Sequence, residues 1–286
     1  AIQVQGPAYS SGSFESKYEI ISEIGHGSTS IVYRCRDRRT GSLHACKIID
    51  RRALHGKRNE LLEQFQVEIQ VLQSMKHPNI IRIDDVYLTD SKICMVTEYM
   101  DGGELFDYIV DKGKSAGAEV KIIDFGLAKL LDEDAKTQSF LGTRGYLAPE
   151  MLQRQAYTRS VDMWALGVIV YVLLCGCLPF NDDGGRIANE KVARAKFGLR
   201  YPRWANNLSE SAKDLLQNLL EIDSDKRYTA DQALMHPWVT GHKTPNQYLR
   251  SPNYLGKIRQ QRRQGHGHTP HDNDNENRIT SRRQSH

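Results

Sequence analysis

Glycines near the start of the chain form a turn that could bring the backbone close to an anion. Gly25 and Gly27 are followed by Ser30 and Val32, in the order Gly-x-Gly-x-x-Ser-x-Val. Glycine allows close approach, and the amide N–H groups of such a turn can donate to phosphate oxygens. Ser30 stands where a third glycine would complete the pattern. An ordinary hairpin turn therefore explains this segment equally well on its own.

Lys47 is a charged residue in a segment, residues 45–49, that is otherwise suited to burial. An unpaired buried ammonium is costly, so this lysine requires an anionic partner. Glu68 is the best candidate, because it lies beside the apolar face of a helix predicted over residues 60–76. The alternative is a lysine that extends to water and a solvated glutamate.

Asp124-Phe125-Gly126 follows the apolar segment 120–123, for which we predict a strand. An aspartate at the end of a strand, next to a flexible glycine, can hold Mg²⁺ against phosphate oxygens. A strand followed by an Asp-x-Gly turn is also common without any such role. The three segments together therefore carry more information than each one alone.

The elements that must position these residues are mostly strands before residue 100. Strand-like segments are predicted at residues 18–21, 31–33, 43–49 and 92–98. The helix at 60–76 has apolar residues at positions 61, 62, 65, 69 and 72, and His77-Pro78 ends it. Gly102-Gly103 then marks a hinge-like break.

After this break the pattern becomes helical. Helices are predicted at residues 104–110, 161–174, 209–222 and 229–236. The last begins with Thr229 and has Gln232 three residues later, which fits a capping box. We therefore expect a flexible lead-in over residues 1–17, a β-rich unit over 18–100, a helical unit over 101–240 and a basic, mostly disordered tail over 241–286.

The composition and charge exclude several classes of function. The net charge is +4, but residues 241–286 carry +6, which leaves −2 for the rest. A nucleic-acid-binding fold is not indicated. The longest apolar run, residues 163–174, is too short to span a bilayer. Five cysteines form no readable disulfide framework and indicate reduced thiols inside the cell, in the cytoplasm or nucleus.

The order and spacing of these motifs are similar to those of the protein kinase family, of the serine/threonine type and the calcium/calmodulin-dependent group. The resemblance covers about residues 18–239. It rests on Gly25, Gly27, Val32, Lys47, Glu68, His77-Pro78-Asn79-Ile80, Asp124-Phe125-Gly126, Gly142 to Glu150, Asp162 to Val168, Arg227 and His236-Pro237-Trp238.

The resemblance implies a two-lobed α+β fold, with a β-rich N-lobe, an α-helical C-lobe and Mg-ATP bound between them. It places Thr97 at the gatekeeper position, with Glu98, Tyr99 and Met100 as the adenine-contacting hinge. The other implied ATP-site residues are Ile24, Gly25, Gly27, Val32, Ala45, Lys47, Glu68 and Glu104, with Asp124 for the metal.

The same resemblance assigns roles in the C-lobe. Thr143 favours serine/threonine over tyrosine specificity, and Thr137, Ser139 and Thr143 are candidate regulatory phosphosites. Glu150 is expected to pair with Arg227, and Asp162 to brace the backbone below the catalytic loop.

One segment of the family pattern is missing. The chain lacks roughly forty residues between Gly113 and Val120, where the motif H-R-D-x-x-x-x-N and a central C-lobe helix belong. The catalytic base and the second metal-binding side chain are absent with it, and the helix at 161–174 loses a neighbour.

Three interpretations are open. The sequence is an incomplete version of a working kinase, or a pseudokinase that acts as a scaffold or regulatory binding protein, or an enzyme with an unusual base. Asp107 and Asp111 are the nearby candidates for that base. The basic segment 254–263 is either a solvated tail or a calmodulin target.

Overall fold

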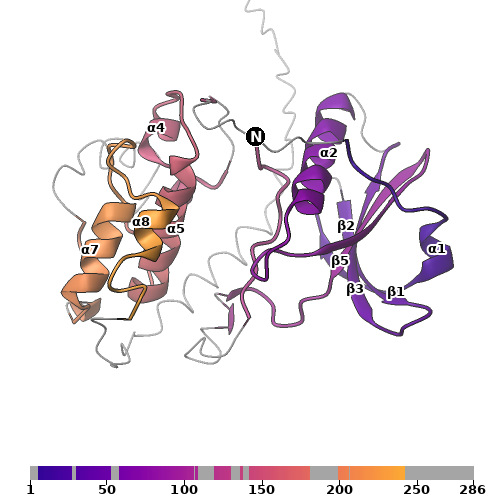
Figure 1. Cartoon of the computed structure of the whole chain (residues 1–286), viewed down its shortest axis with the longest axis horizontal. Helices are drawn as coiled ribbons and strands as arrows, with labels where there is room; N and C mark the ends of the chain where they lie inside the picture. Colours follow the sequence, from indigo (N-terminus) through magenta and orange to yellow (C-terminus); the bar gives the residue numbers. More distant parts are fainter. Residues whose placement is uncertain are drawn as a thin grey trace, which may run out of the picture.

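The computed structural model describes residues 6–27, 30–52, 58–105, 107–108, 119–129, 136–137, 142–180, 199–205 and 207–241. They form two bodies side by side, one built on a sheet and one built of helices (Figure 1). This is the two-lobed α+β architecture of the prediction. The tail from residue 242 onward and Ser139 lie outside the described residues.

The N-lobe is a five-stranded antiparallel sheet in the order β1-β2-β3-β5-β4. Its strands are β1 (Tyr18–His26), β2 (Ser30–Asp37), β3 (Leu43–Asp50), β4 (Ile83–Leu88) and β5 (Lys92–Glu98). The helix α2 (Arg58–Ser74) covers one face of the sheet, in agreement with the predicted helix. The edge strand β4 has no counterpart in the sequence prediction, because Asp84 and Asp85 interrupt its apolar alternation.

Each face of the sheet has its own apolar cluster. Ile49, Met95 and Val86 face the α2 residues Phe65, Ile69 and Leu72. On the opposite face, Phe14, Tyr18 and Tyr87 pack with the thiols of Cys35, Cys46 and Cys94. All five cysteines are free, and burial raises the pKa of Cys35 to about 11, which suits an unreactive thiol.

The predicted flexible lead-in differs from the structure over the residues that are described. Helix α1 (Phe14–Lys17) begins with Ser13 as its N-cap, and Phe14 is only 4% exposed. The Phe14 ring stacks on Tyr18 with a centroid separation of 5.5 Å. Phe14 provides enough apolar area to fix this segment to the sheet, which the polar composition of residues 1–17 concealed.

The C-lobe contains α4 (Pro149–Leu152), α5 (Ser160–Cys175), α7 (Glu210–Leu219), α8 (Ala230–Leu234) and the short turns η1 (Arg144–Tyr146) and η3 (Arg203–Ala205). Its core surrounds Trp164, Val168, Tyr171 and Val172 of α5. The capping box of α8 is present: Gln232 N donates to Thr229 Oγ1, and Thr229 N donates to Gln232 Oε1.

Gly167 of α5 leaves no room for a side chain against the end of α7. A Cβ added there would lie 2.9 Å from Leu219 Cβ and 2.9 Å from Leu220 Cδ2. We expect Gly167→Ala to lower the free energy of unfolding by about 1–3 kcal/mol, because Leu219 Cβ is fixed to the backbone and cannot rotate away. Chemical denaturation followed by tryptophan fluorescence measures this change. Leu166→Ala, at the exposed neighbouring position, is the control and should change stability by no more than about 0.5 kcal/mol.

Candidate nucleotide site

The predicted adenine-pocket and phosphate-binding residues share one face of the sheet. The strand register places Val32 opposite Lys47, and Lys47 opposite Met95. Ala45 lies opposite Thr97 and, two residues from Lys47, points to the same face. Side chains from three strands therefore meet on the face that α2 covers.

Lys47 and Glu68 form the ion pair that the sequence predicts. Lys47 Nζ donates to both carboxylate oxygens of Glu68, at 2.9 and 2.8 Å. The Glu68 side chain is 2% exposed, and the Lys47 ammonium also lies 5.2 Å from the centroid of the Phe65 ring. A buried carboxylate held by one cation fixes the direction of that lysine across the sheet.

The turn of Asp124-Phe125-Gly126 is attached to the N-lobe next to this pair. Ile122 N donates to Asn79 O at 2.8 Å, and Ile81 N donates to Ile122 O at 3.0 Å. Asn79 Nδ2 also donates to Val120 O at 2.8 Å. The predicted strand 120–123 is thus reduced to a single parallel bridge between Ile80 and Ile122.

The backbone of this turn takes an unusual conformation. Asp124 has φ 64°, in the left-handed region that few non-glycine residues adopt. Its Oδ1 accepts from Gly126 N at 3.3 Å. A Cβ added at Gly126 would lie 3.2 Å from that oxygen and 3.5 Å from Glu68 Oε2. Phe125 packs on the α2 face of the sheet, so the turn brings Asp124, Glu68 and Lys47 into one neighbourhood.

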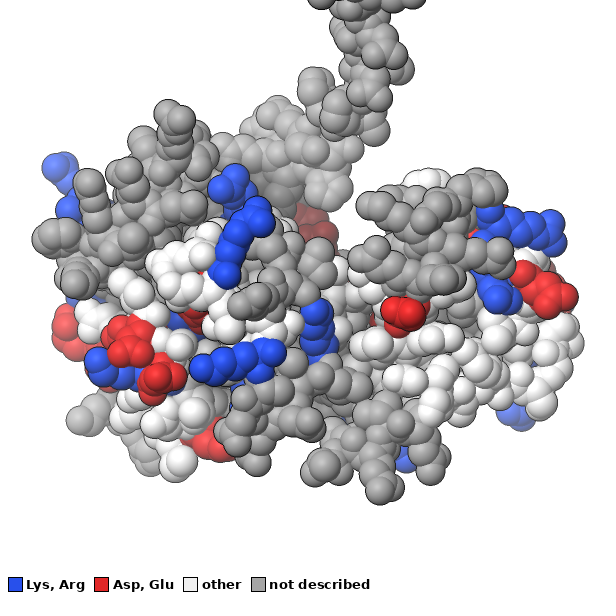
Figure 2. Space-filling model, turned by 90° about the horizontal axis from the view of Figure 1, so that it is seen from above, with Lys and Arg blue, Asp and Glu red and all other residues white. Residues whose placement is uncertain are grey.

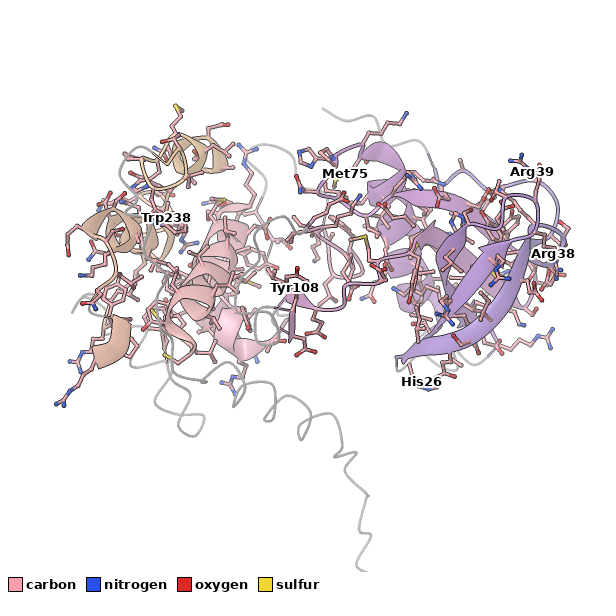
Figure 3. The ribbon with its side chains drawn as sticks, turned by 90° about the horizontal axis from the view of Figure 1, so that it is seen from below. His26, Arg38, Arg39, Met75, Tyr108 and Trp238 are labelled. Atoms are coloured by element: carbon pink, nitrogen blue, oxygen red, sulfur yellow. The ribbon has the colours of Figure 1, made fainter. Side chains whose placement is uncertain are left out.

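The glycine turn joins β1 to β2 at the end of the hairpin, where Figure 3 labels His26. Gly25 lies opposite Val32, and Gly27 N donates to Ser30 O at 2.8 Å. Ile24 is 46% exposed, as a residue that borders an open site would be. The structure describes both glycines but not the tip of the turn at residues 28–29.

A hinge interaction that the sequence analysis missed joins Glu98 to Lys121. Lys121 Nζ donates to both carboxylate oxygens of Glu98, at 2.9 and 3.1 Å, and Arg82 N donates to Glu98 Oε1 at 2.8 Å. Burial alone would raise the pKa of Glu98, but these donors outweigh it and hold the pKa below its usual value. Lys121 stands among apolar residues as Lys47 does, which was the available signal.

The structure also describes Met100 of the predicted hinge and several predicted residues after it. Met100 is 36% exposed, and Glu104 O accepts from Tyr108 N, in the stretch between the two lobes where Figure 3 labels Tyr108. Thr143 is the N-cap residue of η1, and Thr137 forms an antiparallel bridge with Tyr157.

The predicted Glu150–Arg227 pair is present in the C-lobe. Arg227 Nη1 donates to Glu150 Oε1 at 2.7 Å, and Nη2 donates to Oε2 at 3.0 Å. Asp162, in contrast, is exposed, and its carboxylate accepts no hydrogen bond from the described residues. The buried Trp164 Nε1 likewise has no acceptor among them.

The described residues contain no group of three or more His, Cys, Asp or Glu side chains that could hold a metal ion. Mg²⁺ often binds through one or two carboxylates together with waters and nucleotide phosphates, so Asp124 is a suitable type of ligand. In the same part of the chain, no helix is long and apolar enough to cross a membrane. Figure 2 shows basic and acidic side chains interspersed over the described residues of one face.

A protein kinase domain model matches residues 18–119 and 114–239 of this chain. The chain belongs to the protein kinase family. Mouse calcium/calmodulin-dependent protein kinase type IV is 35% identical, covering 78% of this chain and 55% of the relative. Rat calcium/calmodulin-dependent protein kinase type 1B is 35% identical, covering 79% of this chain and 76% of that kinase. The mouse serine/threonine-protein kinase DCLK3 is 36% identical, over 85% of this chain and 36% of its own length.

These kinases are longer than this chain, which spans about half the length of the type IV relatives. The alignments also contain an internal gap. The alignment with the mouse type IV kinase runs over 265 residues, whereas 78% of 286 residues is about 223, so about 40 positions have no counterpart here. The kinase-domain match is split at residues 114–119, where the sequence analysis places the missing segment.

Proposed function

We propose that this chain binds Mg-ATP on the face of the sheet that carries Lys47, and that its family function is phosphoryl transfer to serine or threonine residues of proteins. The observation that supports this most is the Lys47–Glu68 ion pair, with Lys47 Nζ 2.8 Å from Glu68 Oε2, next to the turn of Asp124 and Gly126. Sequence-distant residues meet there in the arrangement that a phosphate-binding site requires.

The roles in this proposal follow from charge and position. Lys47, directed by Glu68, holds phosphate oxygens, and the N–H groups of the turn at Gly25 and Gly27 donate to them. Asp124 provides the carboxylate for Mg²⁺, which when bound neutralises charge on the phosphates. The adenine contacts are Ile24, Val32, Ala45, Thr97, Glu98 and Met100, with Glu104 toward the ribose or a basic peptide.

We propose further that phosphoryl transfer by the chain as it stands is strongly impaired. The family match breaks at residues 114–119, where the base-bearing motif belongs. The carboxylate of Asp162, which the family pattern uses to brace that motif, accepts no hydrogen bond from the described residues. Asp107 and Asp111 are the candidates for an unusual base, and Asp111 lies outside the described part of the chain.

A second candidate function is a pseudokinase-type scaffold that binds partner proteins without phosphotransfer. Three apolar side chains next to Asp124 in the sequence are exposed. The exposed fractions are 62% for Ile122, 61% for Ile123 and 57% for Leu127, and we call these three residues the apolar strip. Exposed apolar strips of this kind are typical of interaction surfaces. Calmodulin is a further candidate partner, at the tail segment 254–263, because two relatives are named as calcium/calmodulin-dependent kinases.

The regulatory sites and boundaries belong to the same proposal. Thr137, Ser139 and Thr143 are the candidate phosphosites, and the lobes extend over residues 18–100 and 101–240. An intracellular location, cytoplasmic or nuclear, fits the free thiols, four of which are buried.

Asp124→Asn tests the metal part of the proposal. Asparagine also tolerates the left-handed conformation at φ 64°, so the turn should be retained. We expect the affinity for ATP in the presence of Mg²⁺ to fall by about tenfold or more, since a neutral amide oxygen replaces a carboxylate as the ligand of a divalent cation. Isothermal titration calorimetry with Mg-ATP, and with ATP in EDTA, separates the metal-dependent part from the rest.

The metal-free affinity of the variant is the control and should match that of the parent chain. If the ATP affinities of the parent chain and of the variant depend on Mg²⁺ to the same extent, Asp124 is not a ligand of the metal. Mg²⁺-dependent phosphorylation of a peptide by the parent chain, lost in Asp124→Ala, would contradict the proposed impairment and favour an unusual base.

A further inference from the structure

Residues 8–18, named the strap from here on, pass the edge of the sheet at β4 and then cross one face of it to the start of β1. The edge strand is β4, and Ser10 pairs with it through Ser10 N to Val86 O at 2.7 Å. Val86 N in turn donates to Ser10 Oγ at 3.1 Å. The strap thus satisfies backbone groups that an edge strand would otherwise leave unpaired.

Asp85 joins the beginning of the strap to its end. Its carboxylate accepts from Ser10 Oγ at 2.8 Å, from Lys17 Nζ at 2.6 Å and from the Tyr18 hydroxyl. The Asp85 side chain is 14% exposed. Burial would raise the pKa of Asp85, but these donors hold it below its usual value. Adding negative charge at Ser10 would place two anions in contact.

The start of the strap binds the C-terminal end of α2. Ala8 N donates to Gln73 Oε1 at 2.9 Å, and Gln73 Nε2 donates to Ala8 O at 2.7 Å. The side-chain amide of Gln73 therefore binds both the backbone N–H and the backbone C=O of Ala8. Glu68, the partner of Lys47, lies on the same helix five residues earlier.

The last turn of α2 packs on the sheet through Leu72, which is 2% exposed, but a pocket lies on the side of the strap. A cavity of about 710 Å³ lies there, bordered by Tyr9 and Ser10 of the strap, by Leu72 and Met75 at the end of α2 and by Ile83 of β4. Figure 3 labels Met75 at this end of the N-lobe. Glu98 and Lys121 also border this cavity, so it extends to the hinge. The two hydrogen bonds from Ala8 add a restraint on Gln73 to the packing of Leu72 on the sheet.

We propose that the strap holds the C-terminal end of α2 and so sets the position of Glu68 against Lys47, with Ser10, Gln73 and Asp85 as positioning residues. For its effect on nucleotide binding, the inference rests on the proposed function. Its effect on α2 itself does not.

The test compares two adjacent serines in the full chain. Ser10→Glu places a carboxylate against Asp85. Ser11→Glu is the matched control, because Ser11 is exposed and its side chain makes no hydrogen bond to the described residues. Hydrogen–deuterium exchange is measured over residues 62–74 of α2 and over α7 as an internal reference. We expect Ser10→Glu and Gln73→Ala to speed exchange in α2 by about fivefold or more, with α7 unchanged.

Ser10→Thr keeps the hydroxyl and should restore slow exchange. Mg-ATP affinity should fall by a similar factor in Ser10→Glu and Gln73→Ala. An unchanged exchange rate of α2 in Ser10→Glu would overturn the inference. A faster exchange rate throughout the chain would also overturn it, because the strap would then only support overall stability. If the parent chain binds no Mg-ATP but α2 still responds to Ser10→Glu, the inference stands and the proposed nucleotide function fails.

Discussion

Inserting the missing segment at residues 114–119 is expected to raise the phosphotransfer rate of this chain by at least about 10²–10⁴-fold. That range is the typical contribution of a positioned general base, and the inserted segment also carries the second metal-binding side chain. The segment of about 40 residues that mouse calcium/calmodulin-dependent protein kinase type IV has at the gap is a suitable donor. A coupled ADP-release assay with a serine/threonine peptide mixture measures the change.

Two controls make this result specific. The same insertion with the aspartate of its H-R-D motif changed to asparagine should fold equally well and stay at the level of the parent chain. Asp124→Ala in the active insertion should abolish turnover. If the parent chain already phosphorylates peptides as fast as the insertion variant, the missing segment is not what limits it.

Arg227→Met is expected to lower the free energy of unfolding of the C-lobe by about 3–5 kcal/mol. Besides the two bonds to Glu150, Arg227 donates to Ser160 O at 3.0 Å and to Glu221 O at 2.9 Å. Its guanidinium also stacks 5.2 Å from the Trp164 ring. The arginine side chain is fully buried and the Glu150 side chain is 9% exposed, so removing one partner leaves an uncompensated buried charge.

Urea denaturation followed by tryptophan fluorescence measures the loss. Lys226→Met is the matched control: Lys226 also forms an ion pair, with Asp223 at 2.9 Å, but is 75% exposed and should contribute little. The double variant Arg227→Met with Glu150→Leu should recover much of the loss, since it removes the orphaned carboxylate. A single variant as stable as Lys226→Met would show that the pair does not hold the lobe together.

The contacts that could be predicted from the sequence involve a known motif or a charged residue within an apolar segment. Lys47 in an apolar strand pointed to Glu68, and the spacing of Thr229 and Gln232 identified the capping box. The roles of these residues toward a nucleotide stay predictions, because geometry alone does not show binding.

The interactions that were missed depend on the tertiary arrangement. Gln73 and Ser10 are ordinary polar residues, and only the route of the chain around β4 brings them into contact with Ala8 and Asp85. The Lys121–Glu98 pair joins residues 23 positions apart. Local sequence patterns do not predict such pairings, because each pairing depends on how the sheet and the segment before Asp124 are placed in the fold.

The attachment of the segment before Asp124 to the N-lobe has a mechanical consequence. Because Val120 and Ile122 are hydrogen-bonded to residues 79–81 of the sheet-bearing lobe, a movement of that lobe carries Asp124 together with the Lys47–Glu68 pair. Under the proposed function, a rotation of the helical lobe would change the distance from the phosphates to an acceptor on that lobe, while the contacts of Lys47 and Asp124 with the phosphates would be kept. The proposal therefore implies that retention of nucleotide and alignment of an acceptor are mechanically uncoupled.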